Sequence, residues 1–136
     1  MNIQEMIDNG LLKVESCSPE LINKELEESE KDLKNAKESF EDGNHKWSII
    51  QAYYCIFHIA RALIYKKGYR EKSHYALYLL LDEFCRKRML ESKYIIYFKA
   101  AMYARQDADY DAVYSEDVAK EILDFAIEFS NLKHKL

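Results

Sequence analysis

The residues in this sequence that could carry chemistry are a histidine, an arginine and the charged and phenolic side chains near them. An arginine can hold a phosphate group through two parallel hydrogen bonds, and a histidine can transfer protons near neutral pH. His74 and Arg105 are therefore candidate catalytic residues for chemistry on a phosphate ester. The candidate ligand-binding residues around them are Lys66, Lys67, Lys72, Asp107, Asp109 and Tyr110.

These residues come together only if the helices that carry them are antiparallel neighbours. Ser73 is placed to cap one helix, and Ser92 starts a second helix that we expect to end near Arg105. Each of these helices is about 23 Å long at 1.5 Å per residue, and their short connection favours antiparallel packing. The second helix therefore ends beside the start of the first, which places His74 and Arg105 at the same end of a bundle.

A structural interpretation of the same residues is also open. Helix ends collect polar side chains as caps, and Arg105 with Asp107 or Asp109 can simply tie a helix to the following loop. His58 and Arg61 fall on one polar stripe of an otherwise apolar segment. We expect that stripe to be a satisfied contact between helices or subunits rather than a catalytic pair.

The sequence carries no metal or cofactor motif. No two histidines share i, i+4 spacing, there is no pair of Glu-x-x-His motifs, and no glycine-rich phosphate loop occurs. The three cysteines, Cys17, Cys55 and Cys85, are far apart and odd in number. They match neither a zinc ribbon nor a disulfide framework and suit a reducing compartment. We predict no metal, no cofactor and a cytoplasmic location.

The composition predicts an all-α protein with one domain over residues 1–136. The chain has one Pro and three Gly, which leaves few residues for hairpin turns, whereas its many Leu, Ala, Glu, Lys and Ile favour helix. The N-terminal residues do not resemble a signal peptide, and no apolar stretch reaches the length that spans a membrane.

The segment Trp47–Lys67 is the expected centre of the fold, because it is apolar around most of its circumference. Around it the periodicity predicts an up-and-down antiparallel bundle of four to five main helices, plus a short N-terminal helix. The acidic stretch Gln106–Tyr114 is predicted to form a loop. The side chains expected to be mostly buried are Trp47, Tyr54, Phe57, Leu63, Leu80, Phe84, Phe98, Met102, Ile122 and Phe125.

The charges are unevenly distributed along the chain. The net charge of −4 argues against broad non-specific binding to nucleic acid. Lys66–Lys93 nevertheless holds eight Lys or Arg against four Asp or Glu, and the acidic segments Glu20–Asp42 and Tyr103–Glu128 flank it. A basic centre between acidic segments can orient a partner, although ordinary solvated helix faces explain it equally well.

The residues Ala52–Gly68, AYYCIFHIARALIYKKG, resemble the HEPN family of small helical bundles. The KSH element at Lys72–His74 is similar to a Lys-Thr/Ser-His element found in one branch of that family. The RQDADYD element at Arg105–Asp111 is similar to the Arg-x-x-Ala-Asp-Tyr element of the same branch. The resemblance covers roughly Trp47–Phe129, and its specificity lies in the order and spacing of these elements.

The resemblance implies a bundle that commonly dimerises and is often encoded beside a minimal nucleotidyltransferase in toxin–antitoxin pairs. Many members are metal-independent RNases whose motif is an Arg followed, four to six residues later, by a His. Arg105 matches the Arg, but Tyr110–Ala112 occupies the place of the His, and the next histidine is His134. In some pairs the nucleotidyltransferase adds adenylates to a Tyr just after that His, so Tyr110 and Tyr114 are the modification candidates.

Three functions therefore stand as expectations. The first is a HEPN-type RNA- or nucleotide-binding protein that is the partner of a minimal nucleotidyltransferase in a toxin–antitoxin-like pair. The second is a metal-independent RNase that uses Arg105 and a histidine from outside the motif, such as His74. The third is a non-catalytic dimeric scaffold. The residues alone do not decide whether the protein is an enzyme.

We expect a homodimer whose contact includes part of the polar stripe of Trp47–Lys67 or the end of the bundle around Arg105. The eleven tyrosines exceed what a small core can satisfy, and a symmetric contact can bury their rings while pairing their hydroxyls. The competing expectation is a monomer in which the first helix, Ile3–Asn9, covers the stripe.

Overall fold

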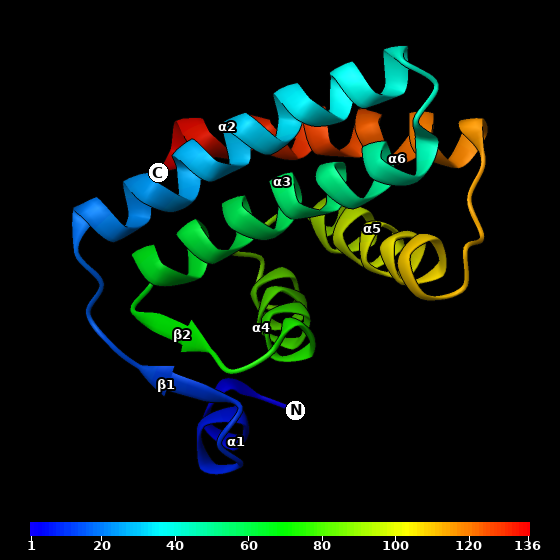
Figure 1. Cartoon of the computed structure of the whole chain (residues 1–136). Helices are drawn as coiled ribbons and strands as arrows, with labels where there is room; N and C mark the ends of the chain where they lie inside the picture. Colours follow the sequence, from blue (N-terminus) through cyan, green and yellow to red (C-terminus); the bar gives the residue numbers. More distant parts are fainter.

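The computed structural model describes all 136 residues, and helices make up most of it. Five main helices follow a short first one, so the predicted all-α bundle is confirmed. Figure 1 shows them in chain order: α1 (Ile3–Asp8), α2 (Pro19–Glu41), α3 (His45–Lys66), α4 (His74–Arg86), α5 (Ser92–Tyr110), α6 (Glu116–Phe129) and a terminal 3-10 segment, η1 (Ser130–Lys135).

The predicted starts of the helices are correct because local side chains define them. The hydroxyls of Ser18, Ser73 and Ser115 each accept a hydrogen bond from the backbone N–H three residues later, at the starts of α2, α4 and α6. Pro19 occupies the first turn of α2, where its missing N–H leaves no partner unsatisfied. Asn44 precedes α3 as predicted, but its side chain makes no capping hydrogen bond.

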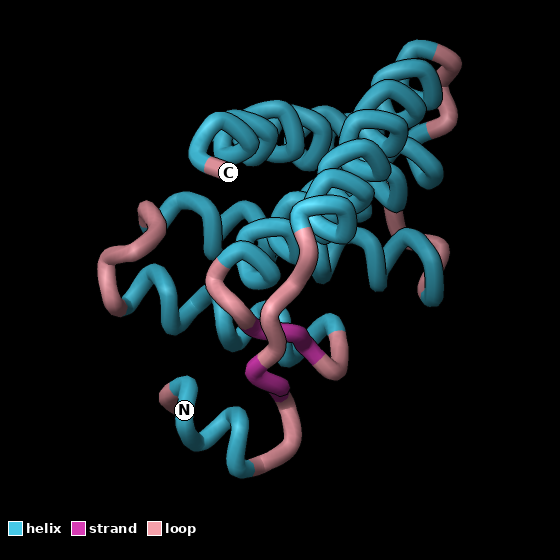
Figure 2. Tube along the Cα trace, turned by 90° about the vertical axis from the view of Figure 1, so that its left-hand side faces the viewer, coloured by secondary structure: helices cyan, strands magenta, loops and turns pink.

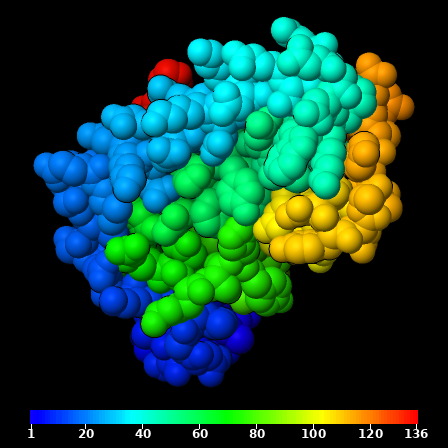
Figure 3. Space-filling model, viewed as in Figure 1, coloured from blue at the N-terminus to red at the C-terminus, as the bar shows by residue number.

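A small antiparallel sheet, which the sequence analysis did not predict, joins the first helix to the bundle. Strand β1 (Leu12–Val14) pairs with β2 (Tyr69–Glu71). Gly68 ends α3 with a φ of +89°, a conformation that glycine adopts without strain, and so turns the chain into β2. Figures 2 and 3 show α1 as a lobe at one end of the molecule, connected to the body through these strands.

The helices form two groups that cross each other. In Figure 1, α2, α3 and α6 run across the view, and α2 is antiparallel to α3 as predicted. The helices α4 and α5 are seen nearly end-on, so they cross α3 steeply instead of running along it. This crossing determines which part of α3 the residues of α4 and α5 can reach.

The central position predicted for α3 is confirmed by the burial of its side chains. Thirteen of its 22 residues are buried, including Tyr53 and Tyr65. Of the side chains predicted to be in the core, six are buried: Phe57, Leu80, Phe84, Phe98, Met102 and Ile122. Three others are half-buried and pack against the core: Tyr54, Leu63 and Phe125.

The prediction for Trp47 is wrong, because this side chain is 49% exposed. Trp47 lies in the first turn of α3, where the helix starts at the edge of the bundle (Figure 1). The ammonium of Lys46 lies 5.6 Å from its ring centroid. A helix that is apolar on most sides is buried only over the length that its neighbours cover.

The polar stripe of α3 faces α2 within the same chain. The Ser48 hydroxyl donates to the Ala36 carbonyl over 2.9 Å, and Nδ1 of His58 lies 2.5 Å from Oε2 of Glu25. The same Glu25 carboxylate pairs with Arg61 at 3.2 Å. The expectation of a satisfied helix contact is thus confirmed, and the alternative that the first helix covers the stripe is wrong. The homodimer itself stays a prediction, without the stripe as a reason for it.

No helix combines the length and the apolar character needed to cross a bilayer. No three His, Cys, Asp or Glu side chains gather in a way that could hold a metal ion.

Candidate functional site

Arg105 projects from α5 into a group of tyrosines. The helix does not end at Arg105 as predicted but continues through Tyr110. Ala108 explains the difference, since it is fully buried against Ile49 of α3 and Ala119 of α6. This packing keeps the acidic stretch helical and brings Tyr110 back over Arg105.

The guanidinium of Arg105 is enclosed by aromatic rings, and the residue is only 8% exposed. Its Cζ atom lies 5.2 Å from the ring centroid of Tyr53, 5.7 Å from that of Tyr54 and 5.6 Å from that of Tyr110. Such rings attract a cation through their electron-rich faces. The sequence therefore folds so that one buried positive charge is held without a buried carboxylate.

The guanidinium retains hydrogen-bonding capacity. Its Nη1 donates to the Tyr110 hydroxyl over 3.2 Å and lies 3.7 Å from Asp109, whereas its buried Nε has no partner. Burial lowers the pKa of Arg105, but the phenol groups of Tyr110, Tyr54 and Tyr53 outweigh burial and raise the pKa overall. The side chain is therefore charged and has N–H groups available for an acceptor.

His74, the first residue of α4, packs into the same aromatic group. Its ring centroid lies 4.4 Å from that of Phe57 and 5.8 Å from that of Tyr53, to which it is nearly parallel. Nδ1 of His74 lies 2.6 Å from the Tyr53 hydroxyl oxygen. Burial, helped by the charges of Arg105 and Arg61, lowers the pKa of His74.

The pKa shifts of Tyr53 and His74 favour the neutral form of both groups at neutral pH. Burial raises the pKa of Tyr53, so this phenol keeps its proton at neutral pH, and His74 is neutral there. We assign Tyr53 as the donor to Nδ1 of His74, because a phenol O–H is the stronger acid of the two neutral groups, and this assignment places the imidazole hydrogen on Nε2. Arg105 contacts the same tyrosine, with its Cζ atom over the phenol ring.

The structure thus brings the two candidate catalytic residues together, as the sequence predicted. Arg105 of α5 and His74 of α4 both contact Tyr53 of α3. Of the candidate ligand-binding residues, Asp109 and Tyr110 join them.

The remaining candidates lie elsewhere. Asp107 and Tyr114 line a separate hollow of about 330 Å³ beside α6. Lys72 follows β2 and borders a small polar hollow with Lys13. Lys66 and Lys67 lie at the end of α3, about 20 Å along the helix from Tyr53 at 1.5 Å per residue. Their predicted place beside Arg105 is wrong, because α4 and α5 cross α3 at its middle.

The residue that connects the site is Tyr53, which is not among the candidate site residues predicted from the sequence. The sequence pattern places it with the other tyrosines, in the core or at an interface, and Tyr53 is indeed fully buried. Its second role as a link between Arg105 and His74 could have been found from the paired tyrosines at Tyr53–Tyr54, which belong to the segment resembling HEPN proteins.

The protein is thus a small helical bundle in which an arginine, a tyrosine and a histidine meet where α3, α4 and α5 cross. The family model of the HEPN domain matches residues 22–136. The chain belongs to the HEPN domain family, which confirms the resemblance and supports a function related to nucleotides or RNA. The matched region begins within α2, so α1 and β1 precede it. No curated protein matches the chain.

Proposed function

We propose that this HEPN-domain protein binds RNA or a nucleotide through Arg105 and His74. The observation that carries the proposal is the contact of both side chains with Tyr53. The guanidinium of Arg105 donates only to Tyr110, through Nη1, so its second terminal nitrogen has hydrogens to donate, and the tautomer assigned to His74 leaves an Nε2–H group. Donors of this kind suit phosphate oxygens, and the tyrosine rings around them suit a base.

The protonation state of His74 favours binding over catalysis. A general base needs a free lone pair, but Nδ1 already accepts from Tyr53 and Nε2 carries a hydrogen. A general acid needs a protonated imidazole, which the lowered pKa of His74 makes scarce at neutral pH. In this arrangement both His74 and Arg105 act as hydrogen-bond donors.

The finer part of the proposal is a partnership with a minimal nucleotidyltransferase in a toxin–antitoxin-like pair. Its support is the family and the accessibility of Tyr110, which is 73% exposed while its hydroxyl lies 3.2 Å from Nη1 of Arg105. A phosphodiester formed on that oxygen would lie beside a guanidinium. Tyr114 is 48% exposed but lies away from Arg105, in the hollow beside α6.

The partnership is tested by co-expressing the protein with a nucleotidyltransferase encoded beside it. We expect the two to co-purify and to associate at micromolar concentration, and ATP to increase the mass of the HEPN protein by one or more adenylates. Tyr110→Phe should abolish that increase, with Tyr114→Phe as the matched control. If the two proteins fail to associate, the partnership is wrong, whereas binding of RNA through Arg105 is a separate measurement.

A second candidate function is a metal-independent RNase. The proximity of Arg105 and His74 favours it, because Arg105 could stabilise a pentavalent phosphate if His74 lost its bond to Tyr53. This function requires cleavage of single-stranded RNA in the presence of chelator, lost in both Arg105→Ala and His74→Ala. Cleavage that survives either substitution excludes it.

The third function, a non-catalytic dimeric scaffold, depends on assembly alone. Sedimentation at micromolar protein, in low and in high salt, measures it. A single species at 16.2 kDa under both conditions would exclude the dimer.

A further inference from the structure

A second group of basic side chains lies far from Arg105, where α3, α4 and η1 all end. We call this group the basic end, and it comprises Lys66, Lys67, Arg86, Lys87, Arg88, Lys133, His134 and Lys135. Three hollows adjoin there. Lys67 lines both the hollow of about 640 Å³ and one of about 200 Å³, and Lys135 lines the latter together with one of about 530 Å³. The three hollows are therefore linked through shared lining residues.

Most of the charges of the basic end are uncompensated. Arg86 pairs with Asp82, and Lys133 pairs with Glu30. The other five cationic side chains have no carboxylate within 4.0 Å and are exposed: Lys66, Lys67, Lys87, Arg88 and Lys135. In a chain with a net charge of −4, this is a local concentration of positive charge. Such a surface attracts polyanions although the whole protein does not.

A structural explanation covers only part of the basic end. Cations in the last turn of a helix complement its dipole, and Lys66 and Arg86 occupy such positions. Arg88 lies beyond α4 with a φ of +58°. At the ends of α2 and α3 the same left-handed conformation is adopted by Gly43 and Gly68. Glycine would be unstrained at position 88, so the backbone of the turn does not require an arginine there.

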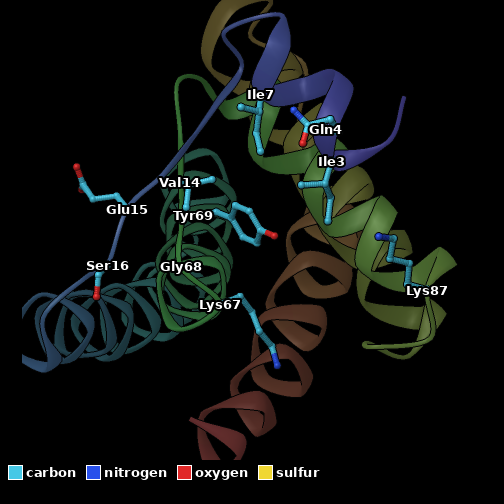
Figure 4. A pocket seen from close by; sticks show the side chains of 10 residues that line it. All are labelled: Ile3, Gln4, Ile7, Val14, Glu15, Ser16, Lys67, Gly68, Tyr69 and Lys87. Carbon is cyan, nitrogen blue, oxygen red and sulfur yellow. The ribbon is translucent and has the colours of Figure 1, made fainter.

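The largest hollow offers more than charge. In Figure 4, Lys67, from the end of α3, and Lys87, from the end of α4, line two sides of this hollow. The ring of Tyr69 and the apolar side chains of Ile3 and Ile7 form other parts of the wall. A volume of about 640 Å³ lies in the range of small-molecule sites. Two ammonium groups beside an aromatic ring suit a phosphate attached to a base.

We propose that the basic end is a second binding surface, which recognises the phosphate groups of a nucleoside phosphate or of single-stranded RNA. The phosphates contact Lys67, Lys87 and Arg88, and a base packs on Tyr69. Stacking on an aromatic ring beside a basic groove is how single strands are held without sequence readout. This inference goes beyond the proposed function, because it uses neither Arg105 nor His74.

The test measures binding of a fluorescein-labelled single-stranded RNA of mixed sequence to the whole protein, and separately binding of ATP. The Lys67→Gln/Lys87→Gln variant should lower the affinity for RNA about tenfold, and the slope of log K against log salt should fall by about 1.4 for two lost phosphate contacts. The control is Lys24→Gln/Lys34→Gln, which removes two exposed lysines of α2 and should leave binding unchanged.

With Arg88→Gly, a loss of binding could not be attributed to misfolding. It removes a charge while relieving a strained backbone, so binding should weaken while the Tm stays the same or rises. Competition by ATP would identify a nucleoside phosphate as the ligand, and RNA binding that ATP does not displace would identify the polynucleotide.

The outcomes separate the two sites. If RNA binding is lost in Arg105→Met but unchanged in the lysine variant, the basic end is not a binding surface and the proposed function is supported. If binding is lost in the lysine variant but unchanged in Arg105→Met, the basic end is the binding surface and the proposed function is wrong. Absence of binding to both RNA and ATP overturns both. Sedimentation with vesicles rich in anionic lipid, without RNA or ATP binding, would overturn the basic end as a nucleotide surface.

Discussion

The hydroxyl oxygen of Tyr53 lies 2.6 Å from Nδ1 of His74, and the Cζ atom of Arg105 lies 5.2 Å from the ring centroid of the same tyrosine. The three residues come from α3, α4 and α5, so this contact is also where those helices cross. A buried phenol that donates to a neutral imidazole needs no buried counter-charge. The arrangement therefore holds a cation and two polar groups inside the bundle while keeping N–H groups available.

Stability should fall as the pH drops below the ordinary histidine pKa of 6.5. The pKa of His74 is lowered in the folded protein, so over the window below 6.5 the unfolded chain binds more protons than the folded one. The free energy of unfolding must then decrease as the pH falls through that window. Thermal melts at about pH 7.5 and about pH 5.5 measure the decrease.

The control for this pH dependence is His74→Asn, whose side-chain oxygen can replace Nδ1 as the acceptor for Tyr53. This variant should lose less stability than the wild type between the two pH values. An equal loss in both proteins would show that groups other than His74 cause the acid sensitivity.

Glu25 should contribute strongly to stability, because it is 7% exposed and pairs with both His58 and Arg61. Glu25→Ala leaves these two side chains without their common partner, which should lower the free energy of unfolding by about 2 kcal/mol. Glu28→Ala changes a partly exposed residue of the same helix that pairs only with Lys31, and it should alter the free energy of unfolding by less than about 0.5 kcal/mol. Urea unfolding measures both, and similar values for the two variants would contradict this role of Glu25.

Phe98 should be among the most costly core positions. It is fully buried in α5, with its ring centroid 6.0 Å from that of Tyr53. Phe98→Ala should lower the free energy of unfolding by about 3–5 kcal/mol. The control Ile96→Ala changes a residue of the same helix that is 61% exposed, and it should alter stability by less than about 0.5 kcal/mol. A cost below about 1 kcal/mol for Phe98→Ala would contradict the observed packing.

The parts of the fold that were predictable from sequence depend on local interactions. Ser18, Ser73 and Ser115 determine where helices begin through hydrogen bonds to residues three positions away. The end of α5 was not predictable in this way, since the contact of Ala108 with Ile49 comes from a distant part of the chain. The exposure of Trp47 likewise depends on where neighbouring helices end.

The proximity of His74 and Arg105 was predictable from the sequence, but the set of residues around them was predictable only in part. An antiparallel return of the chain was enough to bring His74 and Arg105 together. Hydrophobic periodicity does not reveal the angle at which α4 and α5 cross α3. The prediction that Lys66 and Lys67 lie beside Arg105 was wrong for this reason. The same angle leaves those lysines in the basic end.

The most direct test of the account is the affinity of the whole protein for a short single-stranded RNA, measured for wild type and for Arg105→Met. Methionine retains much of the length of arginine but has no charge and no N–H groups. Lys99→Met, which removes an exposed cation from the same helix, is the matched control. Arg105→Lys is informative because lysine keeps the charge but cannot form two parallel hydrogen bonds.

Arg105→Met should weaken binding by about tenfold or more, which corresponds to about 1.4 kcal/mol. Arg105→Lys should restore only part of the affinity, and Lys99→Met should bind like the wild type. Unchanged affinity in a folded Arg105→Met variant would contradict the claim that the residues around Tyr53 form the binding site.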